Sequence, residues 1–228
     1  RERPPRGGAE TVAFIGATGS GKTTLVSLAA RFYDATAGQV LVDGVDVKDY
    51  TFDALYDRIG YVTQKAILFS GDIRSNVLFG ESRGGGSDGD VGEALDLAQA
   101  SEFVEKLPQG IRAPVAQGGS NVSGGQKQRL SIARALARKP EILVLDDSFS
   151  ALDYRTDAKL RAGLARELRD TTKLIVAQRI GTIRDADKIV VLDEGKIAGM
   201  GIHEELMQTC PVYQEIARSQ LSPDELGA

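Results

Sequence analysis

Eight residues, Gly16 to Thr23, read GATGSGKT and fit the pattern G-x-x-x-x-G-K-[ST]. A short apolar stretch precedes them and a helical pattern follows, which is the context that this motif requires. Glycines let backbone N–H groups close around phosphate oxygens, and the N-terminus of the following helix adds positive potential. Lys22 would neutralise the β- and γ-phosphates of a nucleotide, and the hydroxyl of Thr23 would bind Mg²⁺. A flexible turn with a chance lysine is the alternative, and the agreement of motif and context favours the phosphate site.

A second stretch, ILVLDD (Ile142–Asp147), ends a predicted buried strand in two adjacent carboxylates. In nucleotide-binding cores with such a phosphate loop, an apolar strand ends beside the loop with an acid for Mg²⁺, and Asp146 takes that place. A strand that merely stops at an Asp turn is the alternative, but the phosphate loop upstream argues against it. Asp147 then stands where a base that orients the attacking water is expected.

A third stretch, NVSGGQ, places Ser123 and Gln126 at the spacing of a capping box, which predicts a helix start. The capping box leaves Gly124 and Gly125 unexplained, because each costs about 0.8–1 kcal/mol relative to alanine within a helix. Bare backbone at a helix N-terminus suits an anion that comes very close. Since the chain already has one phosphate loop, a second anion site implies a second nucleotide or a partner's nucleotide.

Hydrophobic periodicity predicts the elements that position these motifs. Strands alternate with helices, so we expect an α/β fold with a mainly parallel sheet covered on both faces. Residues 70–138 show helical patterns without strands, which predicts an inserted helical subdomain, and residues 81–90 form a low-complexity surface loop. Strands are expected at 11–16, 58–64, 141–146, 172–178 and 188–199, a hairpin at 38–47, and helices at 22–33 (with Leu25, Leu28, Ala29 and Phe32 on one face), 90–106, 125–138, 155–169 and near the C-terminus.

Composition excludes some classes of function. The chain has 228 residues, enough for one large domain, and its net charge of −4 without a basic block makes nucleic acid a poor partner. Cys210 is the single cysteine, so no internal disulfide is expected. No run of 18 apolar residues is present, and RERPPRGG lacks the apolar core of a signal peptide, so neither a bilayer span nor a leader is expected in this sequence.

The order of the motifs resembles the ATP-binding cassette (ABC) family, from about Thr11 to Gln220. GATGSGKT resembles its Walker A loop, Gln64 in YVTQ its Q-loop, NVSGGQ its signature motif, ILVLDD its Walker B strand and SALD its D-loop. The segment from Leu68 to Gly80 is similar to the exporter subfamily, where it belongs to the surface that touches the transmembrane domains. Five motifs in this order make the resemblance specific.

The resemblance implies a P-loop NTPase core (1–69 and 139–228) with a small antiparallel β region and a helical signature subdomain (70–138). It implies ATP and Mg²⁺, transmembrane domains as partners, and a place at the cytoplasmic face of a membrane. It also implies a head-to-tail dimer in which each ATP lies between one subunit's Walker motifs and the other's signature motif. The residues implied are Gly16, Thr18, Gly19, Ser20, Gly21, Lys22, Thr23, Thr24 and Gln64 for ATP, Thr23, Gln64 and Asp146 for the metal, Asp147 and Gln178 for catalysis, Ser123, Gly124, Gly125 and Gln126 for the partner's ATP, and Ser150 and Asp153 in the D-loop.

The sequence departs from the family pattern at several positions. Asp147 stands where the family usually has glutamate, and Gln178 in IVAQRI stands where it usually has histidine. His203 lies elsewhere, in a segment where a helix-end role is expected, and Gln117 replaces an acid that often precedes the signature motif. The family's adenine-stacking aromatic lies upstream of Walker A, and the chain is expected to begin after it, lacking the first strands of the domain.

Two of these departures affect the chemistry. The aspartate carboxylate falls about 1 Å short of a glutamate's, and such a misplacement costs on the order of 10²-fold in rate. Glutamine carries no positive charge, and losing one such contact costs roughly 10²–10³-fold. Beside an intact signature motif, this pattern resembles one half of heterodimeric exporters, which implies an impaired site of its own and a non-identical partner.

Three alternatives remain. A homodimeric exporter ATPase and a regulatory ATP-binding module that never hydrolyses fit the same motifs. A DNA-repair or chromosome ATPase of the same superfamily fits less well, because Gln64 and Ser123 lie too close in sequence, without heptads, to flank a long coiled coil.

Overall fold

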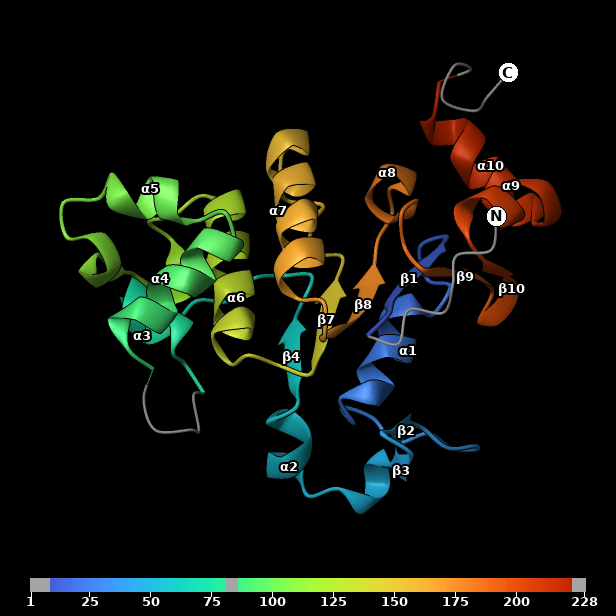
Figure 1. Cartoon of the computed structure of the whole chain (residues 1–228), viewed down its shortest axis with the longest axis horizontal. Coiled ribbons are helices and arrows are strands. Elements are labelled where there is room, and N and C mark those ends of the chain that lie inside the picture. Colours follow the sequence, from blue (N-terminus) through green and yellow to red (C-terminus); the bar gives the residue numbers. More distant parts are fainter. Residues whose placement is uncertain (1–8, 81–85, 223–228) are drawn as a thin grey trace.

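The structure, a computed structural model, describes residues 9–80 and 86–222. A six-stranded sheet crosses its centre in the order β10-β9-β1-β8-β7-β4 (Figure 1). Neighbouring strands pair in parallel except β10, which runs antiparallel to β9. This confirms the predicted α/β fold with a mainly parallel sheet. The strands are β1 (Thr11–Gly16), β4 (Ile59–Val62), β7 (Ile142–Asp146), β8 (Thr172–Val176), β9 (Lys188–Asp193) and β10 (Lys196–Gly201).

Parallel pairing brings the carboxyl ends of four strands to one edge of the sheet. Gly16 ends β1, Asp146 ends β7, and Gln64 and Gln178 lie two residues beyond the ends of β4 and β8. Ligands of open α/β sheets bind outside this edge. The fold therefore gathers motifs that lie far apart in the sequence.

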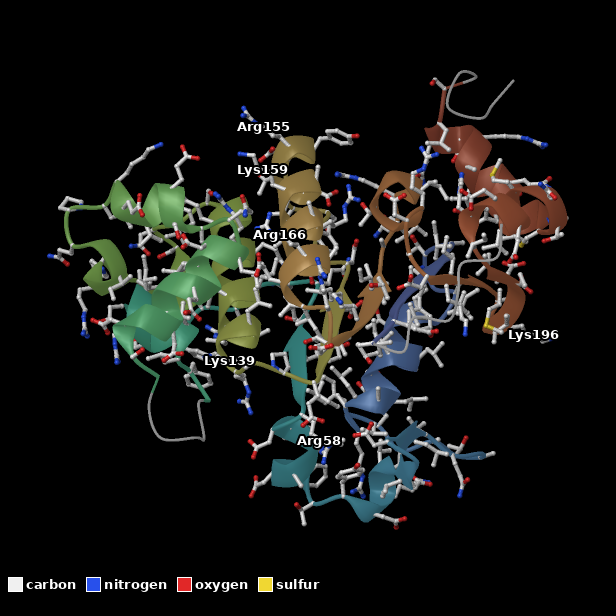
Figure 2. All side chains as sticks on the ribbon, viewed as in Figure 1. Arg58, Lys139, Arg155, Lys159, Arg166 and Lys196 are labelled. Carbon is white, nitrogen blue, oxygen red and sulfur yellow. The ribbon has the colours of Figure 1, made fainter. Side chains whose placement is uncertain are left out.

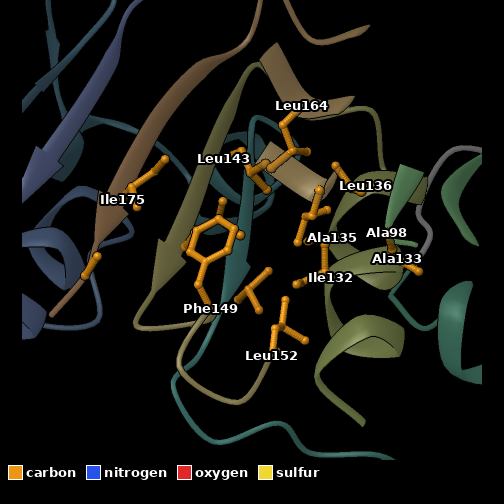
Figure 3. Packing of buried hydrophobic residues seen from close by; sticks show 14 of the residues in the cluster. Ala98, Ile132, Ala133, Ala135, Leu136, Leu143, Phe149, Leu152, Leu164 and Ile175 are labelled. Carbon is orange, nitrogen blue, oxygen red and sulfur yellow. The ribbon is translucent and has the colours of Figure 1, made fainter. Parts of the chain in front are cut away.

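Alternate residues of the strands serve two hydrophobic cores. Phe14, Val144 and Val176 face one core, which is closed by α1, α2 and the β2–β3 hairpin. Leu143 and Ile175 face the larger core, where they meet α6 and α7 (Figure 3). The covering elements are α1 (Lys22–Ala29), β2 (Leu41–Val42), β3 (Val45–Asp46), η1 (Val47–Asp49), α2 (Phe52–Tyr56), α7 (Tyr154–Glu167), α8 (Ile180–Ile183), α9 (His203–Thr209) and α10 (Pro211–Gln220).

Helices between β4 and β7 gather at one side of the molecule, beyond β4 (Figure 1). Two short strands pair antiparallel within this part, so the expectation of helices without strands was wrong. The elements are β5 (Gly71–Asp72), α3 (Ile73–Val77), α4 (Asp88–Leu97), α5 (Ser101–Glu105), η2 (Gly110–Arg112), β6 (Pro114–Val115), η3 (Gln117–Gly119) and α6 (Gly124–Ala137).

Two predicted helices were too long, because each meets a residue in the left-handed region. Helix α1 ends before Arg31 (φ 53°), where the N–H of Phe32 reaches back to the carbonyl of Ser27. Phe32 lies beyond this end and is exposed. Leu25 is exposed within α1, where Val26 supplies the buried face instead. The predicted helix 90–106 divides into α4 and α5 at Gln99 (φ 59°) for the same reason.

Other boundaries also differ from the sequence prediction. The single strand predicted at 188–199 is a hairpin, because Glu194 and Gly195 both have positive φ and turn the chain between β9 and β10. Of the predicted loop 81–90, residues 81–85 lie outside the described residues and Asp88 already begins α4. The hairpin predicted around Asp43-Gly44 is confirmed.

Candidate functional site

Backbone geometry makes the loop from Gly16 to Lys22 an open cradle. Gly16, Gly19 and Gly21 all have positive φ. A Cβ on Gly16 would lie 2.0 Å from the carbonyl oxygen of Leu192 in β9, so only glycine fits this position. Helix α1 begins at Lys22 without a side-chain cap and without an acid in its first turn. Its N-terminal N–H groups are therefore available to an anion.

The Lys22 ammonium group folds into this cradle. Its Nζ donates to the carbonyl oxygens of Gly16 and Ala17, both at 2.8 Å, and to Ser20 Oγ at 3.3 Å. Burial lowers the pKa of Lys22, while the charges of Asp147 and Asp146 oppose that shift. A phosphate would exchange these neutral carbonyl acceptors for a charged one, which makes a stronger hydrogen bond. The donors present thus fit the β- and γ-phosphates of a nucleotide.

A hydroxyl and a carboxylate meet beside the cradle. Thr23 Oγ1 donates to Asp146 Oδ1 at 2.9 Å, and the Tyr61 hydroxyl donates to Asp146 Oδ2 at 3.4 Å. Burial raises the pKa of Asp146, whereas the two hydrogen bonds oppose that shift. Burial and the Asp146 charge raise the pKa of Tyr61 well above its usual value, so Tyr61 keeps its proton. Hard oxygen ligands at a phosphate loop suit Mg²⁺, which Thr23 and Asp146 would hold.

Asp147 receives two amide hydrogen bonds on one carboxylate oxygen. Gln64 Nε2 and Gln178 Nε2 each donate to Asp147 Oδ2 at 2.8 Å. The three side chains come from the ends of β4, β7 and β8, which the parallel sheet places side by side. The predicted Q-loop, base and switch residues therefore converge at one atom. Gln64 was also predicted to bind the metal. Its amide nitrogen donates to Asp147, and the metal role stays a prediction.

The backbone of Asp147 is fixed in an unusual conformation. Its φ is 47°, a region that costs a non-glycine residue about 1 kcal/mol or more. Its N–H donates to Val176 O at 2.9 Å, and its carbonyl accepts from Ser150 Oγ at 2.9 Å. These bonds oppose a backbone shift that would extend the reach of the short side chain.

The predicted capping box forms at the start of α6. Ser123 Oγ accepts from the Gln126 N–H at 3.2 Å, and Gln126 Oε1 accepts from the Ser123 N–H at 2.9 Å. A Cβ on Gly124 would meet nothing within 4 Å, whereas one on Gly125 would lie 3.3 Å from Ala151 O. Packing therefore explains why glycine is needed at position 125 but not at position 124. Without a side chain, Gly124 leaves its backbone exposed to the space outside the helix start.

The signature helix lies far from the chain's own phosphate loop. Helix α6 packs beside β4, and β8 and β7 separate β4 from β1. Three strand spacings amount to about 14 Å. The start of α6 is therefore not placed to share the nucleotide of this chain's own phosphate loop.

The remaining predicted residues differ in burial and in their hydrogen bonds. Asp153 caps α7, because its carboxylate accepts from the Thr156 N–H at 2.9 Å. His203 begins α9, and its Nδ1 lies 2.8 Å from the Tyr213 hydroxyl, which agrees with a helix-end role. Thr18, Thr24 and Gln117 are exposed, and Ser20 is buried beneath the loop.

Sequence reasoning missed two side chains near the site. The Tyr61 ring packs against Phe32, and its hydroxyl contacts Asp146. Gln128 is buried and donates to the carbonyl of Thr63 at 3.5 Å, which links the signature helix to the Gln64 segment. Tyr61 lies in β4 and Gln128 in α6, and both elements were predicted. A polar group among buried apolar residues was the sequence signal that could have identified them.

Comparisons with known proteins agree with this geometry. Residues 7–150 match the family model described as ABC transporter. An uncharacterised ABC transporter ATP-binding protein of Mycobacterium tuberculosis is 50% identical over 215 residues, covering 92% of this chain. The ATP-dependent lipid A-core flippase of Syntrophus aciditrophicus is 42% identical over 218 residues, covering 96%. The structure of a bacterial Atm1-family ABC exporter with ATP bound matches with a TM-score of 0.88 and 37% identity over 93% of this chain.

These relatives are much longer than the chain, which spans 36% of the two curated proteins and 37% of the exporter chain. Within residues 9–80 and 86–222, no helix has the length and apolar character needed to cross a membrane.

Proposed function

The chain belongs to the ABC transporter family, and we propose that it is the ATP-binding domain of a heterodimeric exporter with a catalytically impaired Walker site of its own. Its signature motif would complete the competent site of a non-identical partner domain. The observation that carries this proposal is the pair of glutamine amides on Asp147 Oδ2.

The base position supports an impaired site. Both amides occupy Asp147 Oδ2, so only Oδ1 is left to accept the proton of an attacking water, and the amide bonds make the carboxylate less basic. The side chain is one methylene shorter than glutamate on a fixed backbone. A misplacement of about 1 Å costs on the order of 10²-fold in rate.

The switch position supports it as well. Gln178 reaches Asp147 through a neutral amide, which can donate to a phosphate oxygen but carries no positive charge. Charge that develops on the γ-phosphate in the transition state would therefore find Lys22 but no second cation at the switch position.

ATP binding should survive these changes. The Lys22 cradle and the Thr23–Asp146 pair involve neither Asp147 nor Gln178 in their hydrogen bonds. When bound, Mg²⁺ would neutralise charge on the phosphates. Binding and turnover are thus carried by separate residues of this site.

An exposed aromatic pair supports transmembrane domains as partners. Phe69 and Phe79 are 42% and 52% exposed and stack with ring centroids 4.2 Å apart. The Arg134 guanidinium lies over both rings. Both aromatics lie in the Leu68–Gly80 segment, so we propose this surface as the contact to the membrane-spanning part and the cytoplasmic face as the location.

The isolated chain is expected to bind Mg-ATP and to hydrolyse it very slowly, because its cradle is complete and its base is poor. Calorimetric titration and a phosphate-release assay on the same preparation measure the two properties. Lys22→Ala should abolish binding, whereas Lys159→Ala, which removes an exposed lysine of α7 (Figure 2), should not. Fast hydrolysis that is independent of protein concentration would exclude the proposal.

Addition of the partner domain distinguishes the alternatives. A homodimeric exporter would reach full turnover without a second kind of domain. A regulatory module would show no turnover with or without one. The heterodimer requires turnover that appears only when the partner is present.

A further inference from the structure

Gln220, the last residue of α10, holds the backbone of the segment that carries Gln178. Its Nε2 donates to the carbonyl oxygen of Gln178 at 2.7 Å, and its Oε1 accepts from the N–H of Ile180 at 2.8 Å. The two bonds lie on either side of Arg179. One side-chain amide therefore holds the two peptide groups on either side of Arg179, directly before α8.

Helix α10 delivers this amide from a rigid position. Tyr213, Ala217 and Gln220 have the spacing i, i+4, i+7 and share one helix face. Tyr213 and Ala217 are fully buried, in the same core as Ile180 of α8. The Tyr213 hydroxyl is held by His203 at 2.8 Å. The register of α10 is thus set independently of the site.

Helix α8 depends on this contact at its start. Its N-cap residue, Arg179, makes no side-chain capping bond, and the helix has only four residues. Gln220 Oε1 supplies the missing acceptor to the Ile180 N–H from a distant part of the chain. Loss of Gln220 would leave that N–H without its side-chain acceptor and would let the Gln178–Arg179 peptide rotate.

We propose that Gln220 is a positioning residue for the switch side chain at position 178, so that the placement of α10 sets the placement of the switch. This inference rests on the proposed role of Gln178 in the ATP site. Gln178 touches the reacting region through Asp147, whereas Gln220 acts only through the backbone. A shift of the switch by about 1 Å is enough to change the rate strongly.

Hydrogen exchange of residues 177–184 in the whole assembled transporter tests the contact without using activity. In Gln220→Ala, the Ile180 amide should exchange about three- to tenfold faster, which is the effect of losing one such hydrogen bond. Gln220→Glu keeps an acceptor and should preserve the protection at Ile180. Unchanged exchange in Gln220→Ala would overturn the proposal.

Gln214→Ala is the matched control. Gln214 lies on the same helix and also bonds a backbone carbonyl, that of Met207 at 3.0 Å, away from the switch. The variant should leave exchange at Ile180 unchanged. Equal acceleration in Gln214→Ala and Gln220→Ala would mean general loosening of α10 and would overturn the proposal.

Turnover separates a positioning role from a purely structural one. The test uses Asp147→Glu with Gln178→His in this chain and a partner whose own phosphate-loop lysine is replaced. Gln220→Ala should lower kcat about three- to tenfold with an unchanged KM for ATP. Gln220→Glu keeps the acceptor for Ile180 but loses the donor to the Gln178 carbonyl, so it should lower kcat as well. Faster exchange with an unchanged kcat would overturn the positioning role. If the Asp147→Glu, Gln178→His chain shows no turnover with this partner, the proposed function is contradicted. The hydrogen-exchange comparison would then still show whether Gln220 holds the Ile180 amide.

Discussion

Ser123→Arg in this chain is expected to reduce ATP turnover of the assembled heterodimer by about 10²-fold or more. Ser123 caps α6, whose first N–H groups lie beside the outward-facing backbone of Gly124. Arginine at this position would fill the space that the partner's γ-phosphate must enter. ATP affinity at this chain's own Lys22 cradle should not change, because β8 and β7 lie between β1, which leads into that cradle, and β4, beside which α6 packs.

Ser87→Arg is the matched control for this variant. Ser87 caps α4 with the same kind of capping box, on a helix that packs against α6. Either variant should cost about 0.5–2 kcal/mol of stability from the lost cap. Turnover should collapse only in Ser123→Arg. Equal loss in both variants would show that helix stability, and not access to a nucleotide, controls the rate.

Asp147→Glu combined with Gln178→His is expected to raise turnover at this chain's own site by more than the product of the two single gains. Asp147→Glu should let the carboxylate reach the attacking water, which would raise turnover on the order of 10²-fold. Gln178→His should place a cationic donor at the γ-phosphate, which would raise turnover by roughly 10²–10³-fold. The two groups now share one hydrogen bond and would act on one water and one phosphate. Steady-state ATPase of a double-mutant cycle, with the partner's site inactivated, measures the coupling.

Gln64→His is the control for the switch change. Gln64 Nε2 contacts the same Asp147 oxygen at the same 2.8 Å, but it comes from β4 and not from β8. Histidine there should not raise turnover. A cycle in which the two gains are independent would count against a shared site.

Local motifs were the most predictable part of the structure. The phosphate loop and the Ser123–Gln126 capping box each depend on a few adjacent residues, so spacing alone specified them. The strand β1 was predicted with its observed bounds, because its apolar run ends at the glycine loop. The alternation of strands and helices along the sequence was enough to predict a mainly parallel sheet.

Convergence in space was not predictable from sequence. Two glutamine side chains meet one carboxylate oxygen of Asp147 because β4, β7 and β8 are neighbours in the sheet. The hydrophobic pattern of a single strand does not indicate which strands will be its neighbours. Gln220 reaches the switch only because α10 packs on α8. The breaks at Arg31 and Gln99 were missed because both residues adopt left-handed φ, for which glycine is the usual signal.

Steady-state ATP turnover of the assembled pair with Lys22→Ala in this chain tests the division of labour most directly. We predict that nucleotide binding at this chain's own cradle is lost, while the partner's site, completed by Ser123 and Gly124, continues to turn over at a reduced rate. The contradictory result is turnover that Lys22→Ala abolishes and that Ser123→Arg leaves unchanged.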